Sequence, residues 1–77
     1  MNKKELLERL TAEGVPPDMF SLEGGLPNEQ LCLNQTYKGW EVYYSERGIK
    51  SDLKNFSSEQ DACDYFYKQV KRLMKFM

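Results

Sequence analysis

The sequence contains no histidine and only two cysteines, Cys32 and Cys63. Zinc sites in proteins are built largely from Cys and His, and no loop here has the alternating acidic residues, glycine and terminal Glu of a calcium site. A nucleophilic cysteine needs a neighbouring base to form its thiolate. We therefore expect no metal, no cofactor and no thiol catalysis, and we interpret both cysteines as free thiols.

The sequence also lacks a long apolar run and a strong net charge. No segment approaches the about 18 apolar residues of a membrane-spanning helix. Eleven Lys and Arg stand against twelve Asp and Glu, which gives a formal net charge of −1 and no overall attraction to nucleic acid or to an anionic membrane. The N-terminal residues resemble an amphipathic helix and not a secretion signal. These features predict a cytoplasmic protein that has no membrane partner.

The length of 77 residues allows one small domain, residues 1–77, with one modest core. The sequence is 40% hydrophobic and 30% charged, which is typical of a folded domain. A large active-site cleft is not expected in so short a chain, so we predict no small-molecule substrate. Acid–base catalysis by Glu41 and Asp52 is not expected either, because a flat exposed surface does not raise a carboxyl pKa. The chain is therefore predicted not to be an enzyme.

Two helices are predicted, one near each end of the chain. The first spans Asn2 to Glu13, with Asn2 as its cap and Gly14 at its end. The second begins after Ser57 or Ser58, with acidic residues in its first turns and basic residues in its last, as the helix dipole favours. At about 100° per residue its apolar residues share one face. This face consists of Ala62, Cys63, Phe66, Val70, Leu73, Met74 and Met77.

Three segments between the helices alternate apolar and polar residues, and this period of two predicts β-strands. They are Gln30 to Gln35, Trp40 to Ser45 and Ile49 to Leu53. We expect a three-stranded antiparallel meander, with a possible fourth edge strand at Phe20 to Leu22. The predicted fold is α+β, in the order α-β-β-β-α, with both helices on one face of the sheet.

The turns set which residues share a face of this sheet. We predict four-residue loops at 36–39 and 45–48, because a three-residue loop at 46–48 would place the charges of Lys50, Asp52 and Lys54 on the core face. The core face then contains Leu31, Leu33, Trp40, Val42, Tyr44, Ile49 and Leu53. The opposite face is predicted to be open and to contain Cys32, Asn34, Glu41, Tyr43, Lys50 and Asp52.

Two surfaces are candidates for binding a protein. On the open face, Tyr43 lies beside Lys50, and Glu41 lies across from Asp52, where a basic partner would relieve the repulsion between the carboxylates. At the hairpin tip, Arg47 could bind an anionic group and Glu46 a basic one, although polar residues are also ordinary in a turn.

A third candidate is the basic side of the second helix, which consists of Lys68, Lys71, Arg72 and Lys75. These side chains could contact phosphates while Tyr65, Tyr67 or Phe76 stack on bases. Basic residues are also expected in the last turns of a helix, so an ordinary solvated face is favoured and nucleic-acid binding is the alternative.

The segment "CLNQTYKGWEVYYSERGIKSDLKNFSSEQDACDYF", preceded by "FSLEGGLPNEQ", resembles a family of small immunity proteins. Members are encoded beside bacterial polymorphic and contact-dependent toxins. They share a Gly-Trp-x-Val-Tyr strand, a Ser-Glu-Arg-Gly turn, and a Phe followed by a Ser-x-Glu-x-x-Ala-Cys helix start. The resemblance begins at Phe20.

The resemblance implies a non-enzymatic protein that binds a cognate toxin domain, often a nuclease, and blocks its active site or substrate groove. Immunity proteins of nuclease toxins often mimic nucleic acid with an acidic surface. The near-neutral net charge of this chain differs from that pattern. A local acidic patch, or binding beside the active site, therefore fits the sequence better. The competing prediction is a small nucleic-acid-binding or regulatory adaptor that uses the basic C-terminal helix.

Overall fold

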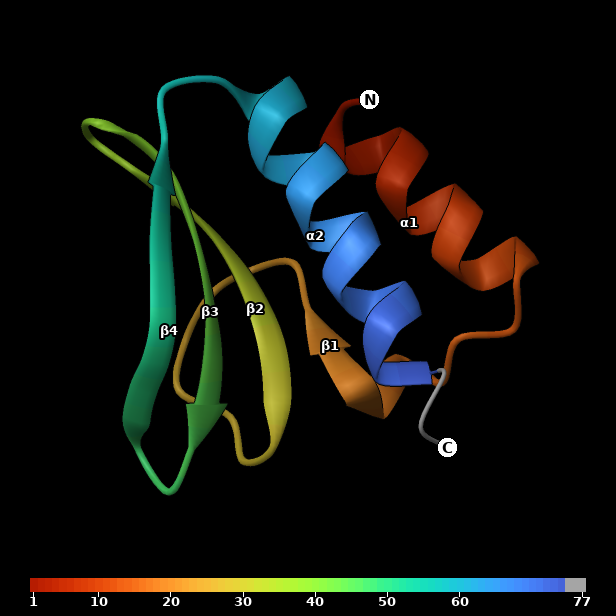
Figure 1. Cartoon of the computed structure of the whole chain (residues 1–77), viewed down its shortest axis with the longest axis horizontal. Coiled ribbons are helices and arrows are strands. Elements are labelled where there is room, and N and C mark those ends of the chain that lie inside the picture. The colour runs from red at the N-terminus through yellow and green to blue at the C-terminus, as the bar shows by residue number, and fades with distance from the viewer. Residues whose placement is uncertain (75–77) are drawn as a thin grey trace.

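The computed structural model describes residues 1–74 and has two helices and four strands (Figure 1). Their bounds are α1 Lys3–Ala12, the 3₁₀ turn η1 Pro17–Met19, β1 Phe20–Ser21, β2 Gln30–Thr36, β3 Gly39–Glu46, β4 Ile49–Phe56 and α2 Glu59–Met74. The predicted α+β fold with a helix at each end is confirmed. Lys75 and Met77, which belong to the predicted faces of the second helix, lie outside the described residues.

The four strands form one sheet in the order β1-β2-β3-β4. Strands β2, β3 and β4 are the predicted antiparallel meander. The additional edge strand is present, and it pairs in parallel with β2 through Phe20 opposite Leu31 and Ser21 opposite Cys32. A parallel pair cannot be joined by a tight hairpin. The chain therefore crosses the sheet between β1 and β2, and we call residues 22–29 the crossing segment.

The caps of both helices and the end of α1 lie where the sequence signals them. The Asn2 side chain accepts a hydrogen bond from the Glu5 amide at 2.8 Å, which caps α1. At the other end of α1, the Val15 amide donates to the Leu10 carbonyl at 3.0 Å, as in a helix terminated by a glycine. The Ser58 hydroxyl accepts from the Asp61 amide at 3.1 Å and caps α2.

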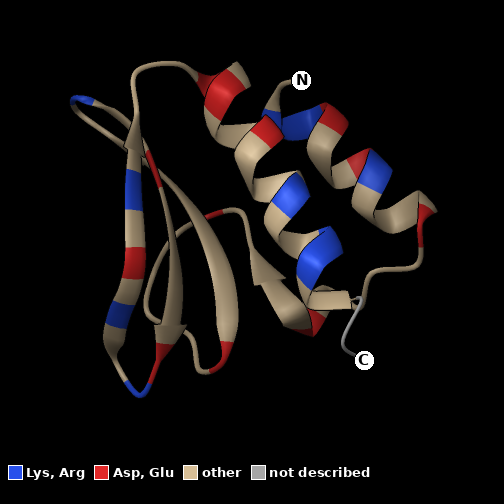
Figure 2. Ribbon diagram, viewed as in Figure 1, with Lys and Arg blue, Asp and Glu red and all other residues tan. Residues whose placement is uncertain are grey.

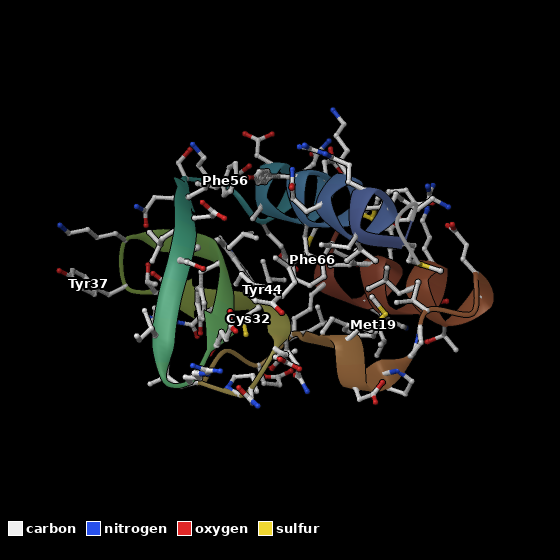
Figure 3. The ribbon with its side chains drawn as sticks, turned by 60° about the horizontal axis from the view of Figure 1, so that its bottom comes forward. Met19, Cys32, Tyr37, Tyr44, Phe56 and Phe66 are labelled. Atoms are coloured by element: carbon white, nitrogen blue, oxygen red, sulfur yellow. The ribbon has the colours of Figure 1, made fainter. Side chains whose placement is uncertain are left out.

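The main core lies between the helices and one face of the sheet. In Figure 1, α2 lies beside the sheet and α1 lies on the far side of α2, near β1. Figure 3 shows Phe66 of α2 and Tyr44 of β3 in the layer between helix and sheet. The rings of Phe20 and Phe66 meet edge to face, with centroids 6.5 Å apart. The buried members of this core are Leu6, Leu10, Val15, Phe20, Leu31, Leu33, Val42, Ala62, Cys63, Phe66 and Val70.

The pairing of β2 with β3 confirms the predicted register. Leu31 lies opposite Tyr44 and Leu33 opposite Val42, on the face that α2 covers. The predicted four-residue loop at 36–39 is shorter in the structure, because Thr36 and Gly39 pair with each other and leave two residues in the turn. The faces are unchanged by this difference, since it adds one residue to each strand.

The pairing of β3 with β4 differs from the prediction. Glu46 pairs with Ile49, so the turn contains only Arg47 and Gly48, both with positive φ (53° and 76°), and the predicted four-residue loop is wrong. Such two-residue turns match the twist of the adjoining strands. Farther along β4 the register shifts at a bulge around Asp52, where φ is 53°.

The bulge changes which residues of β4 face the core. After it, Val42 pairs with Lys54 and Trp40 with Phe56. Phe56 is half-buried and packs against the main core, while Leu53, predicted to face the core, is 40% exposed. One inserted residue reverses the alternation for the rest of a strand. The predicted core position of Leu53 is therefore wrong, and Phe56 occupies that place.

The crossing segment covers the sheet face opposite the helices. It passes behind β2 and β3 in Figure 1, and its Gly24 amide donates to the Leu33 carbonyl at 3.0 Å. A Cβ atom at Gly24 would lie 2.4 Å from Asn34 Oδ1, so the segment approaches this face as closely as a glycine allows. The sheet face that was predicted to be open is therefore largely covered.

Within residues 1–74, neither α1 nor α2 combines the length and the apolar content needed to cross a bilayer.

Candidate functional site

Glu41 and Tyr43, predicted to be exposed on an open face, are buried. Tyr43 is 1% exposed and Glu41 is 8% exposed. Glu41 lies opposite Asn55 and not opposite Asp52, because β4 pairs two residues farther along than predicted and contains the bulge. The predicted repulsion between Glu41 and Asp52 is therefore absent. Asp52 is exposed on the edge strand.

The carboxylate of Glu41 has two partners in the layer beneath the crossing segment. It accepts hydrogen bonds from Asn34 Nδ2 and from Lys50 Nζ, each at 3.0 Å. Burial alone would raise the pKa of this carboxyl, but the hydrogen bonds from Asn34 and Lys50 outweigh burial and lower the pKa below its usual value. Glu41 is thus a paired, ionised group with a structural role in this layer.

The phenol of Tyr43 fastens the crossing segment to the sheet. Its hydroxyl donates to the Gly25 carbonyl at 2.6 Å. Lys50 Nζ lies 4.5 Å from the centre of its ring, which confirms the predicted proximity of Tyr43 and Lys50. Burial, with added contributions from Cys32 and Glu41, raises the pKa of Tyr43 to about 12. Glu41 and Tyr43 therefore hold the fold together and are inaccessible to a partner in this arrangement.

Both cysteines are free thiols, as predicted, but Cys32, which was predicted on an open face, is buried like Cys63. Cys63 lies in the main core, and burial raises its pKa to about 11. Cys32 lies under the crossing segment, donates weakly to the Gln30 carbonyl at 3.6 Å, and also has a pKa raised by burial. Thiols with raised pKa values are poor nucleophiles at neutral pH. Within residues 1–74, no three Cys, Asp or Glu side chains are grouped as a metal site would require.

The hairpin tip displays Glu46 and Arg47 to solvent. The Arg47 amide donates to Asn28 Oδ1 at 3.2 Å, which joins the tip to the end of the crossing segment. This contact uses the backbone and leaves the guanidinium outside it. The two side chains are placed where a partner could reach them, and their role as binding residues stays a prediction.

The basic side of α2 is partly neutralised by α1. Lys71 Nζ forms an ion pair with Glu13, and the Tyr67 hydroxyl donates to the same carboxylate. These hydrogen bonds, that of Lys71 being the larger, lower the pKa of Glu13. Lys68 and Arg72 remain exposed, and Figure 2 shows basic positions on the outer side of α2 with acidic ones nearer its start. The described part of the predicted phosphate-binding stripe thus has three exposed basic residues, of which Lys71 is already paired with Glu13.

A groove between β4 and α2 was not predicted. It has a volume of about 260 Å³, and its walls include Leu31, Val42, Tyr44, Asp52, Tyr65 and Leu73. We call this hollow the β4–α2 groove. On the helix side, the groove is lined by Tyr65, Gln69 and Leu73, which are four residues apart. These residues lie along α2 beside its buried apolar face. This spacing was the only signal of the groove in the sequence, since the facing strand is brought there by the tertiary fold.

The groove adjoins the hairpin tip. A second hollow, of about 300 Å³, is lined by Glu46, Arg47, Ile49 and Ser51. Ser51 lies opposite Tyr44, which lines the first hollow, so the two hollows are neighbours on the helix side of the sheet. Ile49, predicted to be a core residue, is 67% exposed here. A partner that docks at this hollow could therefore contact an exposed apolar side chain.

Another hollow lies between α1 and the edge strand β1. It has a volume of about 550 Å³ and is lined by apolar residues that include Leu7, Phe20 and Leu22. Lys3 and Glu23, which also line it, form an ion pair of 2.5 Å with each other. Lys4 lines the same hollow, so its charged lining carries one more basic residue than acidic ones. No family model, curated protein or solved structure matches the chain, so its candidate site is defined by geometry alone.

Proposed function

We propose that this chain is a non-enzymatic immunity protein that binds a cognate bacterial toxin domain in the cytoplasm and neutralises it through protein–protein contacts. The observation that carries the proposal is the combined surface of the β4–α2 groove and the hairpin tip. There, exposed Ile49 and Leu73 lie beside tyrosines and charged side chains. An apolar and aromatic centre with a polar rim is the composition of protein interfaces.

The buried polar groups support binding rather than catalysis. Glu41 and Tyr43 have partners within the fold, and the two thiols are held protonated by burial. These four buried groups are therefore engaged in the fold and support no catalytic role. The resemblance of the segment from Phe20 onward to toxin-immunity proteins adds a class of partner to this picture.

Neutralisation by such a protein requires a tight stoichiometric complex. The chain would cover the toxin's active site or a surface beside it, and its small size suits a single docking face. A formal net charge of −1 gives no general mimicry of nucleic acid. Local contacts at the groove and tip must then supply the affinity, as hot spots do in other complexes.

The test is co-expression with the toxin encoded beside this chain's own gene. We expect cells to survive toxin expression only when the chain is also produced, and the purified pair to form a one-to-one complex. A toxin gene from an unrelated locus is the matched control, against which the chain should give no protection. Binding to DNA or RNA that weakens steeply with salt, and that is lost when Lys68, Lys71 and Arg72 are neutralised, would instead support a nucleic-acid-binding regulator.

A further inference from the structure

The β4–α2 groove has an apolar floor sized for a side chain. Leu31, Val42 and Tyr44 form the floor, and Tyr65 and Leu73 form the helix wall. Its volume of about 260 Å³ falls below the range of about 300–1,000 Å³ that is typical of small-molecule pockets. Leu73 is 39% exposed. The groove therefore suits one large apolar side chain from a partner better than a free ligand.

Three carboxylates surround this floor. Asp52 lines the groove itself and Glu46 lines the adjoining hollow. Glu29 directly precedes Gln30, the first residue of β2, which pairs with Ser45, so Glu29 and Glu46 lie at the same end of the sheet. Figure 2 shows acidic positions on the strands that meet at this end. Burial raises the pKa of Tyr44, which lines the groove, and the negative charges of Glu29 and Glu46 raise it further.

The negative charge at this surface is not balanced within the fold. Among residues 1–74, no ion pair includes Glu29, Glu46 or Asp52, and Arg47 is the one basic residue that lines either hollow. Carboxylates gathered at one end of a sheet repel one another. A lysine or arginine from a partner would relieve this repulsion, and it would steer the partner towards the groove.

Two other occupants fit the surface less well. A second copy of the chain, docked through the same face about a two-fold axis, would bring carboxylates against carboxylates. A partner strand added to the edge of β4 would meet the bulge at Asp52 and the side chains of Lys50 and Lys54, which are features that discourage edge pairing. The occupant must therefore bind through side chains and carry positive charge.

We infer that the β4–α2 groove and the hairpin tip form the docking surface for a basic segment of the partner protein. An apolar or aromatic side chain of that segment enters the groove, and flanking Lys or Arg side chains pair with Glu29, Glu46 and Asp52. The inference rests on the proposed function for the identity of the partner as a toxin domain. The surface and its chemistry follow from the groove and its charges alone.

A peptide titration tests the surface without a toxin. The probes are two capped peptides of equal length, one alternating Phe with Lys and the other alternating Phe with Glu, added to the ¹⁵N-labelled full chain. The Phe–Lys peptide should shift amide resonances at Glu46, Ile49, Ser51 and Leu73, and binding should weaken at high salt. Shifts located elsewhere, or equal binding of both peptides, would overturn the inference.

Charge variants test the rim. The triple variant Glu29→Gln, Glu46→Gln and Asp52→Asn keeps side-chain size and should weaken the Phe–Lys peptide about tenfold or more, which equals about 1.4 kcal/mol. The matched control is Glu5→Gln, Glu8→Gln and Asp18→Asn, which makes the same change in net charge at exposed positions away from the groove. The control should change the affinity less than about twofold. Equal losses in the two triple variants would show attraction by net charge only and would overturn the proposed site.

An apolar variant tests the groove itself. Leu73→Ser should weaken the Phe–Lys peptide, whereas Leu7→Ser, at a leucine of similar exposure beside the other hollow, should leave the affinity unchanged. Thermal unfolding of each variant verifies that the fold is retained. Unchanged binding by a folded Leu73→Ser variant would contradict insertion of a side chain at this place.

The toxin experiment separates this inference from the proposed function. If the wild-type chain protects cells and the Glu29, Glu46 and Asp52 triple variant protects equally well with unchanged affinity, the docking surface is wrong and the immunity function stands. If the wild-type chain gives no protection while the Phe–Lys peptide still binds through the three carboxylates, the immunity function is wrong and the docking surface stands.

Discussion

At the scale of single residues, the polar layer beneath the crossing segment contains both a satisfied and an unsatisfied hydroxyl. The Tyr43 hydroxyl donates to the Gly25 carbonyl, whereas the buried Ser45 hydroxyl has no hydrogen-bond partner in the described residues. The two residues lie on the same strand and on the same face of the sheet. A buried hydroxyl without a partner loses its hydrogen bonds to water and gains none in the folded state, which destabilises the fold. A paired hydroxyl contributes about 1 kcal/mol to the free energy of unfolding.

Deleting each of these hydroxyls should have opposite effects. Tyr43→Phe should lower the free energy of unfolding by about 1–2 kcal/mol, because it also leaves the Gly25 carbonyl unpaired. Ser45→Ala should leave it unchanged or raise it by up to about 1 kcal/mol. Urea denaturation of both variants measures these differences. A clear destabilisation by Ser45→Ala would indicate that its hydroxyl has a partner after all, such as a bound water.

The ion pair of Glu41 predicts a dependence of stability on pH. The pKa of Glu41 is lowered in the folded state, so its contribution is fully present above its ordinary pKa of about 4.5 and is lost as the pH falls through the lower folded value. Glu41→Gln should therefore destabilise the protein at pH 7, and the difference from wild type should shrink towards pH 3. Denaturation curves at several pH values provide the measurement. A difference that is constant over this range would mean that the charge of Glu41 contributes nothing.

At the scale of elements, the β3–β4 hairpin is determined by its turn and its bulge. Arg47 and Gly48 both adopt positive φ, a geometry that favours Asn followed by Gly. Arginine adopts this conformation at a cost, because its Cβ crowds the backbone. The bulge at Asp52 then lets Ile49 and Phe56, on opposite sides of it, both point towards the helix side of the sheet.

Substitution at Arg47 should reveal the conformational cost of the turn. Arg47→Asn should raise the free energy of unfolding by about 0.5–1 kcal/mol, since asparagine tolerates positive φ. Arg47→Val should lower it, because a β-branched residue is the least suited to this conformation. The amide of residue 47 can still donate to Asn28 in both variants. Equal stability of the two would mean that the turn relaxes to another geometry.

The elements that could be predicted from the sequence are those fixed by local chemistry. The caps at Asn2 and Ser58 and the apolar stripe of α2 are local, and the alternation of β2 and β3 gave the correct register between them. The bulge at Asp52 has no such local signal in the sequence. Its one extra residue reverses which side chains of β4 face the core in the rest of the strand. The predicted face of Leu53 failed for this reason.

The candidate site divides in the same way. Glu46 and Arg47 were predicted at an exposed tip because polar residues followed by glycine are a recognisable turn signal in the sequence. Glu41 and Tyr43 were predicted to be exposed because they alternate with apolar residues. A strand shows the same alternation whether its polar face is exposed to solvent or covered by a polar loop. The path of the crossing segment is a tertiary property, and so is the β4–α2 groove, which depends on where α2 lies against the sheet.

At the scale of the whole molecule, the sheet separates two layers of different character. The layer towards the helices is an apolar core, and it contains Cys63. The layer on the other side is a thin polar one, closed by the crossing segment and containing Cys32. Regions held by few apolar contacts open at lower free energy than the global unfolding of a protein. The two layers should therefore open independently, with the polar layer opening first.

The two cysteines allow this order to be measured. In the variant Cys63→Ala, labelling measures the opening around Cys32 alone. In the variant Cys32→Ala, it measures the opening around Cys63 alone. At pH 8, where burial keeps both pKa values raised, reaction with a disulfide reagent should be slow and limited by opening. Cys32 should react about tenfold faster or more, which corresponds to an opening free energy lower by at least about 1.4 kcal/mol.

Two glycine variants assign this opening to the crossing segment. Gly24→Ala should accelerate the labelling of Cys32 and leave that of Cys63 nearly unchanged, because its Cβ would meet the Asn34 side chain at 2.4 Å. Gly14→Ala has a similar positive φ but no atom within 4 Å of the added Cβ, so it controls for backbone strain and should not act selectively on Cys32. Equal acceleration of both thiols by Gly24→Ala would show that the two layers open together, as one cooperative unit.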